Sequence, residues 1–210
     1  MTGTLRCEPL PGLVVFALAA DFPQPLGVLG AMPVPAAIPE ASAELRTAVR
    51  DMLRQKGYRP TGRGKPSSEY LATALADGRW PQINVAVDAG NHVSLASGLP
   101  ISVVDRELLR GELSVATCGE GAAYVFNAGG QTIDLAGLVC LHDEDGPCAN
   151  AVKDAQRTKT RPETTRVLAV VWGCDAGSPG RTEQAAAALA EAFTRGGATV
   201  ARVETAQATA

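Results

Sequence analysis

Residues able to do chemistry gather first in the segment Asn84–Ser97, which is predicted to be a helix. Asp88, Asn91 and His92 stand at positions i, i+3 and i+4 and therefore share one helix face. A carboxylate or an imidazole placed there could orient a water molecule as a general base. The alternative is that Asp88 and Asn91 satisfy backbone groups at a turn and that His92 is an exposed helix residue. Gly90 inside a helix costs about 1 kcal/mol relative to alanine, which favours a close contact with a ligand or a packed neighbour.

A second group of polar residues lies in the segment Cys148–Thr160, which carries Lys153, Asp154 and Lys159. The Lys153 ammonium could contact a phosphate group, and the Asp154 carboxylate could bind a cationic side chain or an amino group. The alternative is an ion pair in an exposed loop, which contributes little to stability. The residue types alone do not decide whether this segment binds a ligand or is a solvated loop.

The cysteines and histidines give little support to a metal or thiol site. Five cysteines are scattered without a Cys-x-x-Cys pair, which argues against a zinc site or a disulfide framework and predicts buried free thiols. His142 and Asp143 open an acidic turn, but no second histidine stands at ligand spacing, so a solvated turn is favoured over a metal site. Cys140 shares a strand face with His142, yet no third group to orient the imidazole is evident. We therefore expect no metal, no cofactor and no thiol nucleophile.

The charge of the chain is slightly acidic overall and uneven along the sequence. A net charge of −3 argues against strong non-specific binding of nucleic acid. Basic residues nevertheless concentrate in residues 50–65 and 153–166, where each cluster is either a solvated face or a set of phosphate contacts. The candidates for phosphate contacts are Arg54, Arg59, Arg63, Lys65, Arg157 and Lys159.

The remaining segments must position these side chains. Helices are predicted from Ser42 to Gly57, from Ser67 as N-cap to Gly78, and from about Thr182 to Arg195, each with an apolar face or a terminating glycine. Short strands with glycine-rich turns dominate the middle of the chain. The predicted strands are Leu13–Ala20, Pro100–Val104, Leu113–Thr117, Ala123–Phe126, Leu138–Leu141 and a central Val167–Trp172. Because strands and helices do not alternate regularly, the pattern predicts an α+β fold.

Long motifs between Tyr58 and Trp172 resemble the B3/B4 domain of the phenylalanyl-tRNA synthetase beta subunit, and especially free-standing proteins built from that domain alone. The motifs are KPSSEYL at Lys65–Leu71, PQINVAVDAGNHVSLASGLPI at Pro81–Ile101, VVDRELLRG at Val103–Gly111 and RTKTRPETT at Arg157–Thr165. The ordered phrase IN-x-x-VD-x-x-N-x-x-SL-x-x-GLPI is far more specific than an isolated glycine motif. The resemblance implies an α+β domain with a mixed β-sheet and flanking helices, a fold shared with part of tRNA-lysidine synthase.

The resemblance also implies an activity, which is hydrolysis of the ester that joins a wrongly attached amino acid to the end of a tRNA. The pocket helix of the family falls on Asp88–His92, and its pocket floor falls on Ala136 and Gly137. The histidine of the synthetase falls on Ser102, and its tyrosine-sensing glutamate falls near Val171. Because the threonine, histidine and glutamate of that pocket are all replaced, we expect a substrate other than tyrosyl-tRNA.

Hydrolysis of an activated ester needs positioning more than a strong nucleophile. Backbone N–H groups around Gly90, Ala136 and Gly137 could stabilise the developing oxyanion, because glycine allows close approach. Asn91 could hold the terminal ribose or the α-amino group, while Lys153 and Asp154 occupy the places of a basic–acidic pair in relatives. The basic clusters would then contact the acceptor end of the tRNA.

These inferences combine into one expectation for residues 1–210. The chain would be a single B3/B4-like domain with a core over residues 10–200 and a frayed tail over residues 201–210. It would act in the cytoplasm as a free-standing aminoacyl-tRNA deacylase. No membrane span is expected, since no run of about 18 apolar residues is present, and no DNA partner is expected either. The alternative is a non-catalytic module that binds tRNA or an amino acid.

Overall fold

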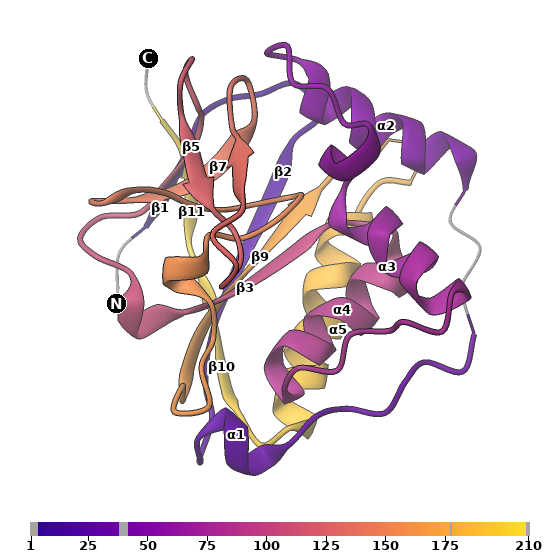
Figure 1. The fold of residues 1–210 in the computed structure, drawn as a ribbon, viewed down its shortest axis with the longest axis vertical. Helices are drawn as coiled ribbons and strands as arrows, with labels where there is room; N and C mark the ends of the chain where they lie inside the picture. Colours follow the sequence, from indigo (N-terminus) through magenta and orange to yellow (C-terminus); the bar gives the residue numbers. More distant parts are fainter. Residues whose placement is uncertain (1–3, 38–41, 177, 209–210) are drawn as a thin grey trace.

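The computed structural model describes residues 4–37, 42–176 and 178–208 of the chain (Figure 1). Its central sheet has four antiparallel strands in the order β10 (Thr199–Val203), β2 (Val14–Asp21), β9 (Arg166–Gly173) and β3 (Ile101–Asp105). Every residue of β9 after the first is buried, because this strand has a neighbour on each side and a layer on each face. The prediction of a central strand over the apolar run at 167–172 is confirmed.

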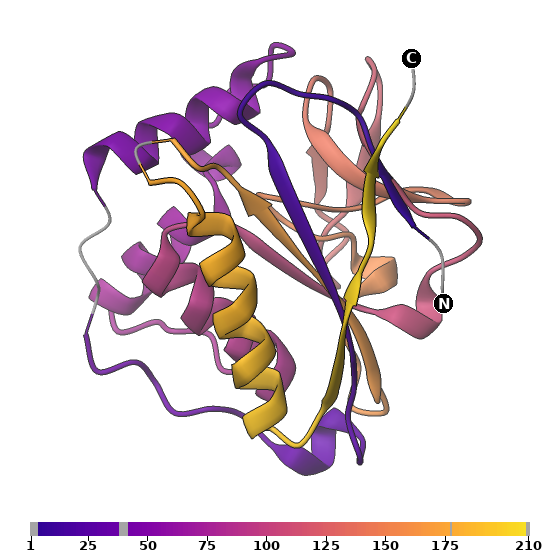
Figure 2. The ribbon, with the colours of Figure 1, turned by 180° about the vertical axis from the view of Figure 1, so that it is seen from behind.

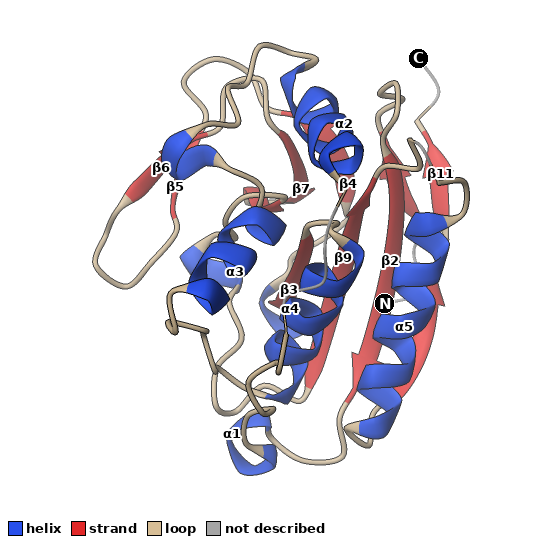
Figure 3. Cartoon of the chain, turned by 90° about the vertical axis from the view of Figure 1, so that its right-hand side faces the viewer, coloured by secondary structure: helices blue, strands red, loops and turns tan. Residues whose placement is uncertain are grey.

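A layer of helices covers one face of this sheet. Helix α5 (Arg181–Arg195) contacts β2, β9 and β10, and helix α4 (Val85–Ser97) contacts β3 and packs along α5 (Figures 2 and 3). The N-cap Asn84 accepts a hydrogen bond from Val87 N at 3.0 Å. The helical layer therefore confirms the predicted helices at 84–97 and 182–195.

The other helices lie around this layer. Helix α1 (Leu26–Leu29) is a single turn, α2 (Ala43–Arg54) begins after the N-cap Ser42, and α3 (Ser67–Ala76) contacts α4. Ser42 Oγ accepts from Leu45 N at 3.1 Å, as expected for a cap.

A second sheet covers the opposite face. Its five strands are β11 (Thr205–Gln207), β1 (Leu5–Cys7), β4 (Ser114–Thr117), β7 (Val139–Asp143) and β8 (Gly146–Asn150), in that order. Strand β1 runs parallel to both neighbours and the other pairs are antiparallel, so the sheet is mixed. A separate hairpin joins β5 (Ala123–Val125) and β6 (Thr132–Asp134). The α+β class with a mixed sheet and flanking helices is confirmed.

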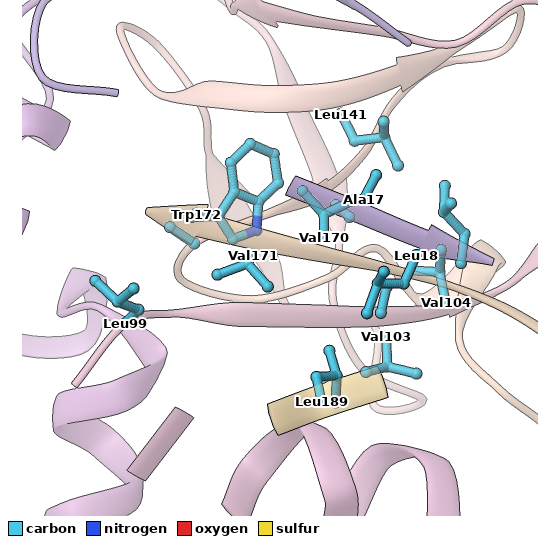
Figure 4. Close-up of a cluster of buried hydrophobic side chains, with 14 of the residues drawn as sticks. Ala17, Leu18, Leu99, Val103, Val104, Leu141, Val170, Val171, Trp172 and Leu189 are labelled. Atoms are coloured by element: carbon cyan, nitrogen blue, oxygen red, sulfur yellow. The ribbon is translucent and has the colours of Figure 1, made fainter. Parts of the chain in front are cut away.

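Alternation along the central strands divides the core between the two faces. Trp172 and Val170 point toward the five-stranded sheet and its Leu141, whereas Val171 points toward the helices and Leu189 (Figure 4). All of these side chains are fully buried and belong to one continuous apolar cluster. One residue of register therefore decides whether a side chain of β3 or β9 faces the helices or the second sheet.

Two local predictions were wrong. The segment 201–210 was expected to fray, yet β10 pairs with β2 and β11 pairs with β1 (Figure 2), while residues 209–210 lie outside the described part. Main-chain hydrogen bonds hold these exposed strands, and such bonds leave no apolar pattern in the sequence. Ser67 is not the N-cap of α3 but its first residue, since Pro66 is the cap and Ser67 N donates to Ala151 O at 2.8 Å.

Within residues 4–37, 42–176 and 178–208, no helix combines the length and apolar character that crossing a membrane requires.

Candidate functional site

A cavity of about 640 Å³ opens beside β3, at the edge of the central sheet. Its walls come from the turn Gly62–Gly64, from α3, from the start of α4, from the β5–β6 hairpin and from the segment that follows β8. Figure 3 shows α3 between the β5–β6 hairpin and α4. The lining residues are Gly62, Arg63, Lys65, Tyr70, Thr73, Ile83, Val87, Val103, Phe126, Asn127, Val152, Lys153, Asp154, Lys159 and Thr160.

The position of the cavity follows from how the edge of β3 is covered. Val104 forms an isolated antiparallel bridge with Lys159, so the segment after β8 shields the strand edge in place of a further strand. Val103 projects from β3 toward the helices and Val87 projects from α4 beside it. Tyr70 and Ile83 remain 54% and 57% exposed although both line the cavity. The cavity therefore has an apolar wall that extends out to solvent.

Asp154 is the one carboxylate among the cavity-lining residues. Its Oδ1 accepts from Ser102 Oγ at 2.7 Å and from Asn150 N at 3.3 Å. Burial raises the pKa of Asp154 from 3.8 to about 6, and the hydrogen bonds from Ser102 and Asn150 only partly offset that effect. A carboxylate with a pKa close to neutrality is suited to accept and return a proton.

A buried polar network holds the loop that carries Asp154. Asn150, only 2% exposed, accepts from Val152 N at 2.8 Å and from Lys153 N at 2.9 Å through its Oδ1. Its Nδ2 donates to Tyr124 Oη at 2.5 Å, and the Tyr124 hydroxyl donates to Lys153 O at 2.5 Å. Because these bonds fix the backbone on both sides of Lys153, the network presents Asp154 to the cavity in a defined orientation.

Ser102 anchors this network to the central sheet. Ser102 is 1% exposed, and its Oγ also contacts Asn150 O at 3.1 Å and accepts from Trp172 Nε1 at 2.9 Å. The side chain lies behind Asp154 and does not line the cavity. Ser102 is thus placed to position Asp154, not to contact a substrate.

Cationic side chains line the cavity around Asp154. Lys159 Nζ donates to Phe126 O at 2.6 Å, and Lys153 Nζ lies 4.2 Å from the centre of the Phe126 ring. Burial lowers the pKa of both lysines, and Arg63 and Lys159 lower the pKa of Lys153 further by repulsion. Lys65 completes the set of four cations on the cavity wall. The cavity is therefore apolar on one side and positively charged on another.

The polar face of α4 is present as predicted, but Asp88 and His92 bind backbone groups and do not line the cavity. Asp88 is fully buried, and its two oxygens accept from Met32 N and Ile83 N, each at 2.9 Å. His92 Nε2 lies 2.9 Å from Pro33 O, and its ring packs edge-on against Trp80. These contacts attach the segment around residues 32 and 33 to α4, which is the backbone-satisfying alternative for Asp88.

Gly90 and Asn91 also lie outside the cavity lining. A Cβ at Gly90 would stand 2.8 Å from Val103 Cγ2 and 3.6 Å from Ile101 Cγ2, so the glycine lets α4 approach β3 closely. Asn91 is half-buried and follows Val87 by one helical turn on the same face. Gly90 and Asn91 therefore lie one helical turn beyond the lining residue Val87, without lining the cavity themselves.

Ala136 and Gly137 contribute to packing elsewhere. Ala136 N donates to Asp134 Oδ1 at 2.9 Å, and neither residue is among those that line the cavity. Gly137 has φ +73°, and a Cβ there would stand 2.2 Å from Lys56 O, so this position requires glycine for a close backbone approach. The structure does not bring these residues together with the 88–92 segment in one cavity.

Three of the six candidate phosphate contacts line the cavity and three do not. Arg63, Lys65 and Lys159 line the cavity. Arg157 instead makes a two-pronged pair with the buried carboxylate of Asp143, at 2.9 and 2.6 Å. The remaining two are exposed residues outside the lining, namely Arg54, paired with Asp51 at 2.7 Å, and Arg59.

The five cysteines are free and buried, as predicted. No group of three potential ligands that could hold a metal ion occurs within residues 4–37, 42–176 and 178–208. Sequence reasoning missed Asn150, Tyr124 and Tyr70, and an Asn four residues before an Asp in a non-helical segment was the only local signal for the first.

Comparisons with known proteins bear on this site. A family model described as the B3/4 domain matches residues 58–209. No curated protein matches the chain. Among solved structures, the chain is similar to an N-terminal fragment of the phenylalanyl-tRNA synthetase beta-subunit from Pyrococcus horikoshii, with a TM-score of 0.53 and 9% sequence identity. The alignment covers 97% of this chain and 52% of that one, so the chain spans about half of its length, and at this identity the likeness is one of fold.

Proposed function

The chain belongs to the B3/4 domain family, and from that premise we propose that it is an aminoacyl-tRNA deacylase acting through the cavity beside β3. The observation that carries the proposal is the placement of Asp154, a half-buried carboxylate with a pKa near 6, among lysines on the wall of a partly apolar cavity. The similar synthetase fragment supports tRNA as the partner, since its name places it in a tRNA-charging enzyme.

The shape and charge of the cavity suit the charged end of a tRNA. Its volume of about 640 Å³ lies within the range of small-molecule sites, and it can seat an amino acid together with part of a nucleoside. Val87, Val103 and Val152 offer an apolar surface to the amino-acid side chain. Arg63 and Lys65, both exposed at the cavity, can meet the phosphates that lead to the terminal adenosine.

The proposed reaction is a general-base hydrolysis. Asp154 accepts a proton from a water molecule whose oxygen attacks the ester carbonyl, forming the new C–O bond and a tetrahedral oxyanion. Lys159, whose ammonium is half-buried near Asp154, stabilises the negative oxygen. The bond to the ribose oxygen then breaks, and the proton held by Asp154 passes to that oxygen, so that free amino acid and intact tRNA leave.

This assignment moves the general base away from the helix where the sequence suggested it. Asp88 and His92 are engaged by backbone groups near residues 32 and 33, whereas Asp154 faces the cavity. We retain the inference that the substrate is not tyrosyl-tRNA, because Asp154 is the one carboxylate on the cavity wall and is assigned to the base role. Such an activity would be exercised in the cytoplasm, where aminoacyl-tRNAs are used.

The test is a deacylation screen with the full chain. Each tRNA of a complete set is charged with cognate or non-cognate amino acid, labelled at its terminal nucleotide, and incubated with the protein while release is followed. Catalysed release from at least one mischarged tRNA, lost in Asp154→Asn and kept in Asp77→Asn, is the expected result. Asp77 is an exposed residue after α3 that pairs with the exposed Arg79 and lies outside the cavity lining, so its substitution is a matched control.

Two outcomes would contradict the proposal. Tight binding of aminoacyl-tRNA without release would favour a non-catalytic tRNA- or amino-acid-binding module. Release from free aminoacyl esters at the same efficiency as from aminoacyl-tRNA would identify a small-molecule esterase instead.

A further inference from the structure

A cysteine–histidine pair lies in the five-stranded sheet, apart from the cavity. Cys118 directly follows β4 and His142 lies on β7, and His142 Nε2 stands 3.5 Å from the Cys118 sulfur. The other ring nitrogen, Nδ1, stands 3.1 Å from Cys140 O. Because a carbonyl oxygen can only accept, Nδ1 carries a proton, and Nε2 is left directed at the thiol. The arrangement has a nucleophile, a base and an orienting group.

The sequence pattern that suggested a thiol site pairs His142 with Cys140, not with Cys118. Cys140 and His142 share a strand face at i and i+2, but the imidazole bonds the Cys140 carbonyl and turns toward a cysteine 24 residues earlier. The missing third group is thus supplied by main chain, which no residue type can indicate.

The electrostatics of the pair favour a thiolate beside an imidazolium. A hydrogen bond with Cys140, together with the hydrogen bond and charge of His142, lowers the pKa of Cys118 to about 5 against the opposing effect of burial. The hydrogen bond with Cys118 raises the pKa of His142. Other titratable groups that act on this pair or on Cys140 are Asp143 on β7, Cys148 on β8, Tyr124 on β5 and Tyr58 in the loop after α2.

The other thiols in comparable surroundings behave in the opposite way. Burial raises the pKa of Cys7 to about 11 and raises the pKa values of Cys140 and Cys148 as well. Burial alone therefore does not explain the lowered pKa of Cys118, which comes first from the hydrogen bond with Cys140 and then from the hydrogen bond and charge of His142.

Access to the sulfur is narrow. Cys118 is 5% exposed, so little of this residue meets solvent. A bulky reagent is therefore excluded, and a reagent that reacts with the sulfur must be little larger than water. Hydrogen peroxide is an electrophile of this size that thiolates attack.

We propose that Cys118, paired with His142, is a peroxide-reactive thiolate that is converted to sulfenic acid. The sulfur attacks one peroxide oxygen, forming an S–O bond and breaking the O–O bond. The departing hydroxide takes the proton from His142 Nε2 and leaves as water. The sulfur loses two electrons and the peroxide gains them. This site does not depend on the deacylase function.

The test treats the folded full chain with hydrogen peroxide for set times, removes the peroxide with catalase, and then unfolds the chain in urea containing dimedone, which traps sulfenic acid once the fold no longer excludes it. Peptide mass spectrometry then measures the label on each cysteine. Cys118 should be labelled well ahead of Cys7, the internal control. Between pH 6 and 8 its labelling rate should change by less than about 3-fold, whereas an ordinary thiol with a pKa of about 8.5 would become faster by roughly 50-fold or more. His142→Gln should slow labelling at pH 7 by about 10-fold, because the loss of thiolate is partly offset by greater intrinsic nucleophilicity.

Three results would overturn the proposal. Cys118 labelled no faster than Cys7, a rate that rises with pH as for an ordinary thiol, or an unchanged rate in His142→Gln would each do so. If His142→Gln does not fold, as judged by circular dichroism, the pH profile of the unsubstituted chain decides the question.

Discussion

Two regions of this molecule, helix α4 and the segment 150–159, both carry polar residues, but the hydrogen-bond partners of those residues differ. On α4, Asp88 and His92 direct their polar atoms to backbone groups of another segment. In the 150–159 segment, Asp154 and Lys153 are held by main-chain and side-chain bonds but keep a face on the cavity. The first region is satisfied internally, and the second is partly buried while still open to a ligand.

The difference teaches how to separate structural polar residues from functional ones. A buried carboxylate that accepts two backbone N–H groups stabilises the fold because it satisfies donors that burial would otherwise leave without a partner. A carboxylate whose pKa burial raises to about 6 destabilises the fold at neutral pH, so its retention needs another reason. The two regions should therefore respond to substitution with opposite signs.

The largest expected effect is on activity at Asp154. Asp154→Asn keeps an oxygen that accepts from Ser102 and Asn150 but removes the base, so deacylation should fall by about 100- to 10 000-fold. The same variant should unfold with a free energy higher by about 1–3 kcal/mol at pH 7, because the cost of ionising the buried carboxylate is removed. Urea unfolding and single-turnover deacylation measure the two effects. A destabilised variant would show that Asp154 is structural.

The next largest effect is on stability at Asp88. Asp88→Ala leaves two backbone donors, Met32 N and Ile83 N, without their acceptor and should lower the free energy of unfolding by about 2–3 kcal/mol. Activity per folded molecule should be nearly unchanged. Asp51→Ala, which removes an exposed pair with Arg54, is the control and should change stability by less than about 0.5 kcal/mol. A stable but inactive Asp88→Ala would return the catalytic role to α4.

The pH dependence of rate and stability tests the role of Asp154 further. Since Asp154 must be ionised to act as a base and its pKa is about 6, deacylation should be constant above pH 7 and fall about 10-fold by pH 5. The folded-state pKa lies above the usual 3.8, so the stability difference between Asp154→Asn and the unsubstituted chain should grow from pH 4 to pH 6 and then level off. A rate that is flat down to pH 4.5 would exclude Asp154 as the base.

A smaller effect is expected at Lys153. Lys153→Met retains the packing of the stem on Phe126 but removes the charge, so KM for aminoacyl-tRNA should rise about 3- to 10-fold with kcat little changed. The dependence of KM on salt should also weaken. Lys56→Met, an exposed lysine outside the cavity lining, is the control and should leave both properties as they were.

The smallest effect is expected at Asn91. Because this residue lies outside the cavity lining, Asn91→Ala should change kcat/KM by less than about 3-fold. A loss of about 100-fold would instead indicate that the substrate reaches along α4 past Val87 and that this face of the helix belongs to the site.

The sequence predicted the fold well wherever periodicity and caps carry the information. The apolar run at 167–172, the cap at Asn84 and the apolar face of the last helix each correspond to an observed element. Strands β10 and β11 were missed because these exposed strands are held by main-chain bonds to distant partners. Strands β6 and β8 were also missed, although each pairs with the strand just before it in a hairpin, because they are short and carry no alternating apolar pattern.

The candidate site was predicted only in part, because residues far apart in the sequence hold its side chains in place. Lys153, Asp154 and Lys159 were recognised as candidates and do line the cavity, but the network through Asn150, Tyr124 and Ser102 joins residues up to 52 positions apart. Which face a polar helix residue presents to a ligand depends on which neighbour covers it. For Asp88 and His92, that neighbour is a proline-rich stretch whose path no local pattern specifies.

By itself, the sequence determined the class of the fold, the family and the residue types from which a site could be built, because these depend on local periodicity and on ordered motifs. The tertiary structure alone decided which carboxylate is open to a cavity, which is bound by backbone, and which cysteine receives the imidazole. The physical reason is that burial, hydrogen bonding and the resulting pKa are properties of a side chain's spatial neighbours, and most of those neighbours come from distant parts of the chain.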